Sequence, residues 1–134
     1  MDAHRYLLDT NIVSHLIRYP NGPIFNRLES ILPATACTSI IVAAEIQFGL
    51  RKNGSAKLSR QAKLILSAMD VLPLEPPADS HYGEIRNHLN RMGQTIGGND
   101  LFIAAHARSL DLILVTDNIG ELSRVPGLKV ENWL

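Results

Sequence analysis

The chain has 134 residues, of which 46% are hydrophobic and 19% are charged, and these ordinary globular values exclude an intrinsically disordered protein. Thirteen basic and thirteen acidic side chains cancel, which excludes a strong overall attraction to nucleic acid and leaves only a local basic patch for such binding. A single cysteine, Cys37, excludes an internal disulfide, and with no secretory signal and no apolar run approaching ~18 residues we expect a soluble, cytoplasmic protein outside any membrane.

Short apolar runs of strand type alternate along the chain with amphipathic stretches of helical period. The runs predict strands at 6–8, 35–38, 71–74, 112–116 and 128–133, and the amphipathic stretches predict helices over 11–31 with a break at Pro20, and over 39–50, 55–69, 78–93 and the residues after Gly98. Parallel strands need long crossovers that are usually helical, so the alternation favours a parallel sheet. We therefore predict an α/β sandwich with a central, mainly parallel sheet, formed by one domain over residues 1–134.

Three aspartates adjoin the apolar runs. Asp9 and Asp117 each end such a run, and Asp100 directly precedes another. Each has an ordinary alternative: Asp9 could cap the next helix, Asp100 could open its helix, and Asp117 could form a turn. The carboxyl ends of parallel strands share one edge of a sheet, where ligand sites gather, and this favours a common site instead.

A fourth carboxylate, Glu45, lies inside the helix predicted over 39–50. Its neighbours three and four positions away are Ile41, Val42, Phe48 and Gly49. We therefore predict that Glu45 lies on an apolar helix face, where a lone carboxylate is costly. The alternative to a cation site is a buried ion pair, for which Arg86 is the candidate.

The four carboxylates together indicate a metal site. Crowded carboxylates repel one another and resist ionisation, and a hard divalent cation relieves that repulsion. We predict that the metal ligands and catalytic residues are Asp9, Glu45, Asp100 and Asp117. Ligands that are all oxygen favour magnesium or manganese over zinc.

Polar and basic residues supply further candidates. Asn11 and Thr116 are predicted to orient a carboxylate or a metal-bound water, whereas Thr10 and Asn118 are interpreted as turn residues. A stretch without any acid carries five cations: Arg51, Lys52, Lys57, Arg60 and Lys63. It could be a solvated helix face, but beside a metal site we interpret it as a surface that contacts phosphate groups. The five histidines lack the spacing of a zinc motif and are interpreted as surface or core residues.

These segments resemble, in order, the motifs of PIN-domain ribonucleases. The resemblance is carried by Leu7-Leu8-Asp9-Thr10-Asn11, the helical Glu45, the stretch 96–107, and Leu114-Val115-Thr116-Asp117-Asn118. It runs from Tyr6 to Trp133 without a large insertion, and within the family the chain resembles the VapC toxins of bacterial toxin–antitoxin pairs.

The resemblance implies a fold, an activity and partners. It implies a Mg²⁺- or Mn²⁺-dependent endoribonuclease that is neutralised by an antitoxin protein and forms a homodimer or a toxin–antitoxin hetero-oligomer. The subgroup that the chain resembles cuts initiator transfer RNA, so transfer RNA is the expected substrate. The family's four acidic positions fall on the four carboxylates above, and a further acidic position matches Glu121, which could equally be a solvated helix residue.

Three other functions fit the sequence less well than this one. A phosphatase of the haloacid dehalogenase type needs a second aspartate two residues after the first, where this chain has Asn11. A receiver-like signalling domain needs an aspartate at the end of a middle strand, and the run 71–74 brings none. The remaining alternative is a non-catalytic PIN-like module that binds RNA or protein. A complete set of costly carboxylates argues against it.

Overall fold

A five-stranded parallel sheet lies at the centre of the computed structural model, which describes residues 4–31 and 33–134. The strands are β1 (Tyr6–Leu8), β2 (Ala36–Ser39), β3 (Asp70–Leu72), β4 (Ile113–Val115) and β5 (Val130–Glu131), in the order β3-β2-β1-β4-β5. β1 pairs with both β2 and β4, and its residues Leu7 and Leu8 are fully buried. A strand covered on both faces needs a continuous apolar run, which is the pattern that predicted β1.

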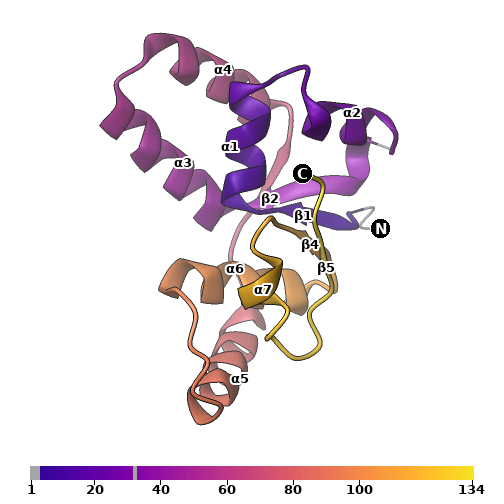
Figure 1. Ribbon diagram of the computed structural model, residues 1–134, viewed down its shortest axis with the longest axis vertical. Helices are drawn as coiled ribbons and strands as arrows, with labels where there is room; N and C mark the ends of the chain where they lie inside the picture. The colour runs from indigo at the N-terminus through magenta and orange to yellow at the C-terminus, as the bar shows by residue number, and fades with distance from the viewer. Residues whose placement is uncertain (1–3, 32) are drawn as a thin grey trace.

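Helices cover both faces of the sheet. They are α1 (Thr10–Arg18), α2 (Pro23–Glu29), α3 (Ile40–Asn53), α4 (Ala56–Ser67), α5 (Ala78–Arg91), α6 (Gly98–Ser109) and α7 (Ile119–Leu122), with the short 3₁₀ helix η1 (Pro33–Thr35) before β2. In Figure 1, α1 to α4 lie above the strands and α5 to α7 lie below them. The division follows from right-handed crossovers: the chain moves outward from β1 to β3 with helices on one face, then returns to β4 with helices on the other.

Local capping fixes where several helices begin and end. Asp9, Ser39 and Ser55 each accept a hydrogen bond from a backbone N–H in the first turn of the helix that follows. Helix α3 ends at Gly54, whose φ of 74° is a left-handed conformation that glycine adopts without strain. The turn at Gly54 lets α4 fold back beside α3, and the two helices form a hairpin at one side of the molecule (Figure 1).

The α/β class and the parallel sheet are confirmed, and the predicted strands and helices agree with the structure to within a few residues. Two details differ. The strand predicted over 128–133 is paired only at Val130 and Glu131, because β5 is an edge strand that meets only the last two residues of β4. Met92, which falls inside the helix predicted over 78–93, lies just after the end of α5 at Arg91 and is 59% exposed. Within the described residues, every helix is too short or too polar to cross a membrane.

Candidate metal centre

The carboxylates gather where the strand order reverses. β1 and β4 are neighbours, but the chain leaves β1 toward β2 and reaches β4 only after the helices of the other face. Such a reversal opens a crevice beyond the carboxyl ends of the two strands. Asp9 follows the last residue of β1, Asp117 comes two residues after β4, and the backbone N–H of Asp9 donates to the carbonyl of Val115 at 2.9 Å. The fold therefore brings residues from opposite ends of the chain to one crevice.

Asp9 is the most buried of these carboxylates, at 5% exposure. Its Oδ1 accepts a 2.7 Å hydrogen bond from the backbone N–H of Thr10, and its Oδ2 accepts one of 2.7 Å from the Thr116 hydroxyl. Burial raises the pKa of Asp9, the two hydrogen bonds lower it in part, and the nearby charges of Glu45 and Asp117 raise it further. Asp9 thus serves both as the helix cap that its sequence position allowed and as the centre of the carboxylate group.

Within residues 4–31 and 33–134, Glu45 is held by a hydroxyl and not by a cation. Its Oε1 accepts a 2.6 Å hydrogen bond from Thr10 Oγ1. The alternative ion pair with Arg86 is wrong, because the Arg86 guanidinium donates instead to the Tyr82 hydroxyl at 2.9 Å. The predicted apolar face around Glu45 is also only partly correct: Val42 is buried, but Phe48 is 69% exposed.

Thr10 is the functional residue that the sequence reasoning missed. Its backbone N–H donates to Asp9 and its hydroxyl donates to Glu45. Thr10 therefore links the carboxylate that follows β1 to the carboxylate on α3. A threonine after a strand is an ordinary helix-start residue, and only the packing of α1 against α3 gives it a second role. Its position directly after Asp9 was the one available signal.

Asp100 faces the same group from the other layer. It is the third residue of α6 and is half-buried. Burial raises the pKa of Asp100 to about 6, and the charges of Asp9, Glu45 and Glu121 add to that rise. Asp100 thus shares its electrostatic field with two of the three other predicted ligands, and with Glu121.

Asp117 lies at the exposed rim. Its Oδ1 accepts a 3.2 Å hydrogen bond from Asn11 Nδ2, which places Asn11 beside a carboxylate. Glu121 is held in a similar way, because its Oε2 accepts a 3.1 Å hydrogen bond from Asn118 Nδ2. The backbone N–H of Asn118 in turn donates to the Thr116 hydroxyl at 3.0 Å. Threonine and asparagine side chains therefore hold both the buried and the rim carboxylates.

The donors of this group are all oxygen, which is the chemistry that suits Mg²⁺ or Mn²⁺. In the part of the chain that the structure describes, no three Asp, Glu, His or Cys side chains close around a single point as a finished metal site. Asp9, Glu45 and Asp117 each accept a hydrogen bond from a neutral side chain instead. The residues fit a divalent cation, whose charge would draw them together.

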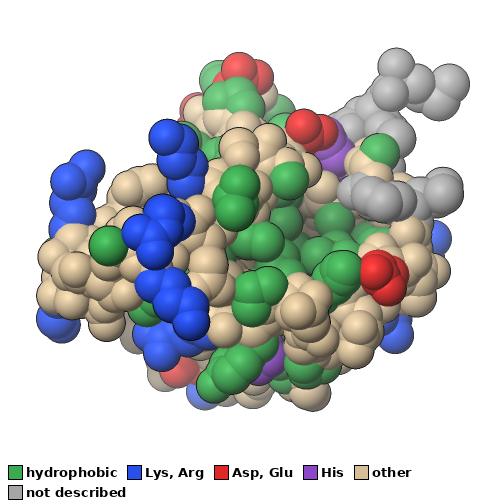
Figure 2. Space-filling model, turned by 90° about the horizontal axis from the view of Figure 1, so that it is seen from above, with side chains coloured by type: hydrophobic (Ala, Val, Ile, Leu, Met, Phe, Trp, Pro, Cys, Tyr) green, Lys and Arg blue, Asp and Glu red, His purple; other side chains and the backbone are tan. Residues whose placement is uncertain are grey.

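The basic cluster lies apart from the carboxylates. Its five members, Arg51, Lys52, Lys57, Arg60 and Lys63, are all exposed, at the end of α3 and along α4. Figure 2 shows Lys and Arg side chains gathered along one side of the face that carries this hairpin. The histidines agree with their interpretation: His106 is a core residue, 1% exposed, with Nδ1 2.7 Å from the Ser39 hydroxyl, and burial lowers its pKa.

In the metal-free protein, Asp100→Asn should raise the free energy of unfolding at pH 7 and leave it nearly unchanged at pH 4. The carboxyl of Asp100 ionises near pH 6 in the folded chain, against 3.8 in the unfolded one. The folded state holds more protons between these values, so wild-type stability falls as pH rises through that window. Asparagine has no charge to repel, and we expect a gain of about 1 kcal/mol after allowance for partial exposure.

Urea denaturation in chelator at several pH values measures this difference. Asp79→Asn, which changes an exposed aspartate in the first turn of α5, is the matched control and should show no pH-dependent gain. A gain for Asp100→Asn that is equal at pH 4 and pH 7 would contradict the assignment of the repulsion to Asp100.

Comparison with known proteins agrees with this geometry. The model of the PIN domain family matches residues 6–128. Ribonuclease VapC2 of Rickettsia felis is 40% identical over 96% of this chain and 97% of its own length. The tRNA(fMet)-specific endonuclease VapC of Shigella flexneri is 36% identical over 96% of this chain and 98% of its own.

A solved structure extends the similarity to three dimensions. The crystal structure of VapBC2 from Rickettsia felis bound to a DNA fragment from the promoter contains a chain that superposes with a TM-score of 0.89 at 36% identity, over 96% of this chain and 98% of that one. The fold, the order of the motifs and the near-complete coverage agree with one another. The chain is a member of the PIN domain family and, within it, of the VapC ribonucleases.

Proposed function

We propose that the chain is a metal-dependent endoribonuclease, the toxin of a toxin–antitoxin pair, and that it hydrolyses phosphodiester bonds in transfer RNA. The observation that carries the proposal is the field shared by Asp9, Glu45 and Asp100 at the reversal of the strand order. A cation in that field would neutralise charges that the fold otherwise holds at a cost. The names of the related ribonucleases support RNA as substrate, and one of them supports transfer RNA.

Asp9 and Asp100 are the residues that would chiefly hold Mg²⁺ or Mn²⁺, with Glu45 and Asp117 completing the ligand shell or positioning water. When bound, such a cation lowers the pKa of a water molecule and withdraws charge from a phosphoryl oxygen. Asp9 is suited to bind first, because hydrogen bonds from Thr10 and Thr116 already fix its orientation. Asp100 must lose a proton that it holds up to about pH 6, so binding is linked to proton release.

The neutral donors of the site act as positioning residues. Thr10 holds Glu45 and Asn11 holds Asp117, each through one side-chain hydrogen bond. These bonds limit how far the two carboxylates can turn away from the crevice. A carboxylate that is already oriented loses less freedom when it binds a cation or a water, and this favours tight binding.

The basic cluster would contact the RNA backbone outside the metal site. Between Glu45 and Asp70 the sequence has no acidic residue, so the exposed cations of the α3–α4 hairpin have no carboxylate among them. Phosphate contacts by lysine and arginine supply affinity and not base selectivity. The hairpin therefore compensates for the neutral net charge of the chain with a local positive field.

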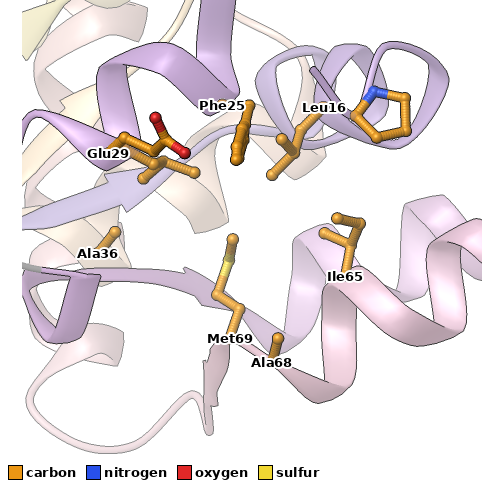
Figure 3. Close-up of a pocket in the computed structure, with 9 residues that line it drawn as sticks. Leu16, Phe25, Glu29, Ala36, Ile65, Ala68 and Met69 are labelled. Atoms are coloured by element: carbon orange, nitrogen blue, oxygen red, sulfur yellow. The ribbon is translucent and has the colours of Figure 1, made fainter. Parts of the chain in front are cut away.

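An apolar groove offers a place for the antitoxin. It has a volume of about 330 Å³ and lies between α1, α2, β2 and α4, and its lining includes Leu16, Phe25, Ala36, Ile65 and Met69 (Figure 3). Figure 2 shows hydrophobic side chains exposed in the middle of this face, beside the basic side chains. An apolar segment of a partner would fit along these helices, within residues 11–31 and 39–69.

The same partner would inhibit by placing an arginine among the carboxylates. A guanidinium is always charged and pairs bidentately with carboxylate, so it would take the position of the cation. Solved VapBC structures support a partner protein for this family. Inhibition would then compete with metal and would not depend on unfolding of the site.

Asp100→Asn should abolish cleavage of transfer RNA, by at least about 100-fold, because it keeps the shape of a metal ligand and removes its charge. Purified protein is incubated with transfer RNA in Mn²⁺, in Mg²⁺ and in chelator, and circular dichroism is recorded on the same samples. Asp79→Asn is the control and should cleave like wild type. Activity that persists in chelator, or in folded Asp100→Asn, would contradict the metal-dependent mechanism. Wild-type protein that binds transfer RNA without cleaving it would instead be a non-catalytic module.

Replacing Arg60 and Lys63 together by glutamate should weaken RNA binding and flatten its salt dependence, while Mn²⁺ affinity stays the same. Each lost phosphate contact lowers the slope of log affinity against log salt by about 0.7 for single-stranded RNA. The control replaces Arg91 and Arg124, two exposed arginines outside the α3–α4 hairpin. A slope that is unchanged in the Arg60 and Lys63 variant would assign the cluster to solvated surface.

In the complex with the antitoxin, replacement of one antitoxin arginine should restore cleavage while the two proteins stay bound. The apolar groove would keep the partner in place, and the freed carboxylates would bind metal again. The partner's arginines are replaced one at a time by alanine and by lysine, and cleavage is assayed with increasing Mn²⁺. If no arginine matters and excess metal never restores activity, the antitoxin inhibits by covering the RNA surface instead.

A further inference from the structure

A second groove lies between α1 and α3, and its lining mixes polar side chains with four apolar ones: Ile17, Ile46, Leu50 and Leu58. It has a volume of about 200 Å³, with Thr10, Asn11 and Glu45 in its lining near the carboxylates and Arg18 and Asn53 toward the other ends of the two helices. Both helices begin at the carboxyl edge of the sheet, so their walls run in the same direction. From Asn11 to Arg18 the wall extends on the order of 10 Å.

The α1 wall is a stripe of polar side chains. Asn11, Ser14 and Arg18 lie three and four positions apart and therefore share one face of the helix. The Nδ2 of Asn11 already donates a hydrogen bond to Asp117. Among residues 4–31 and 33–134, in contrast, the side chains of Ser14 and Arg18 have no hydrogen-bond or ion-pair partner. This wall thus presents one hydroxyl and one guanidinium that a ligand could use.

The α3 wall carries a gap at its middle. Glu45, Gly49 and Asn53 are spaced by four residues and face the groove together. A glycine inside a helix costs about 1 kcal/mol relative to alanine. A Cβ on Gly49 would meet no atom within 4 Å, so no contact within the chain requires glycine there. The space that Gly49 leaves is therefore open toward the groove.

The charges along the groove match a nucleic-acid strand bound across the metal site. Glu45 lies at one end, where a cation would bring the scissile phosphate, and Arg18 lies at the other, where it would meet the next phosphate. Arg51 and Lys52 follow near the end of α3 and continue the positive field. The groove is too small for a duplex, and sequence-specific RNA recognition is directed at single-stranded segments with splayed bases.

We propose that this groove binds the nucleotide next to the scissile phosphate in single-stranded RNA, an inference that rests on the proposed nuclease function. Arg18 binds the neighbouring phosphate, and the space at Gly49 accommodates the nucleotide. The Ser14 hydroxyl donates or accepts a hydrogen bond with the ribose or base, and Asn53 donates through Nδ2, because its Oδ1 already accepts from the Ser55 N–H. Substrates whose cleavage site lies in a loop are then preferred over paired ones, because a paired nucleotide cannot enter the groove.

Gly49→Leu tests the proposal, because leucine favours the helix and fills the groove. The matched control is Gly83→Leu, which makes the same change inside α5, at an exposed glycine whose Cβ would also meet nothing within 4 Å. Both variants should be at least as stable as wild type to urea. Gly49→Leu should lose about tenfold or more in kcat/KM for a single-stranded RNA, with Mn²⁺ affinity unchanged, and Gly83→Leu should cleave like wild type.

A second variant, Arg18→Gln, should raise KM and lower the slope of log affinity against log salt by about 0.7, as expected for one lost phosphate contact. Wild-type protein that cleaves no RNA in Mn²⁺ would refute the nuclease function itself. If wild type cleaves and Gly49→Leu cleaves equally well, the groove does not bind substrate. Loss of Mn²⁺ affinity in Gly49→Leu would also overturn the proposal. Weakened antitoxin binding with unchanged cleavage would overturn it too, because the groove would then belong to the antitoxin.

Discussion

Electrostatic repulsion among carboxylates in one crevice is the constraint on which the rest of the structure depends. Burial and like charges raise the pKa values of Asp9 and Asp100 together, and Glu45 contributes its charge to both. Burying charge without a counterion is expensive, so the fold holds these carboxylates at a cost to its stability. The same repulsion favours a divalent cation, and it also favours an arginine supplied by a partner. In the proposed mechanism, activity and inhibition thus depend on one property of the crevice.

Neutral hydrogen-bond donors and the central sheet keep the mutually repelling carboxylates in place. Thr116 and the backbone of Thr10 fix Asp9, and the Thr10 hydroxyl fixes Glu45 on a helix from the next crossover. Neutral donors stabilise a carboxylate without cancelling its charge, so the negative field remains available to a cation. Lysine or arginine in their place would neutralise the field. The positive side chains of the basic cluster lie instead on the α3–α4 hairpin, apart from the carboxylates.

The sequence predicted the elements of this fold better than their arrangement. Buried parallel strands are continuous apolar runs, so β1 and β4 could be placed, and carboxylates at their ends could be assigned to one edge. The strand order could not be predicted, and with it the contact between Thr10 and Glu45, which are 35 positions apart. The exposure of Phe48 and the open space at Gly49 depend on which face of α3 meets α1 and α4, and helical periodicity gives a face but not its partner. The roles of the four carboxylates as metal ligands remain a prediction, which rests on the sequence and on the arrangement of these residues in the fold.

The most direct test is the anomalous diffraction of manganese in crystals grown with Mn²⁺. The account predicts a peak in the crevice between β1 and β4, with carboxylate oxygens of Asp9 and Asp100 at about 2.0–2.3 Å and Glu45 or Asp117 in the ligand shell or one water away. Crystals of Asp100→Asn under the same conditions should lack the peak. A fully occupied manganese held by other residues, or a crevice that stays free of metal while the wild-type protein cleaves RNA, would contradict the claim that these carboxylates form the catalytic metal site.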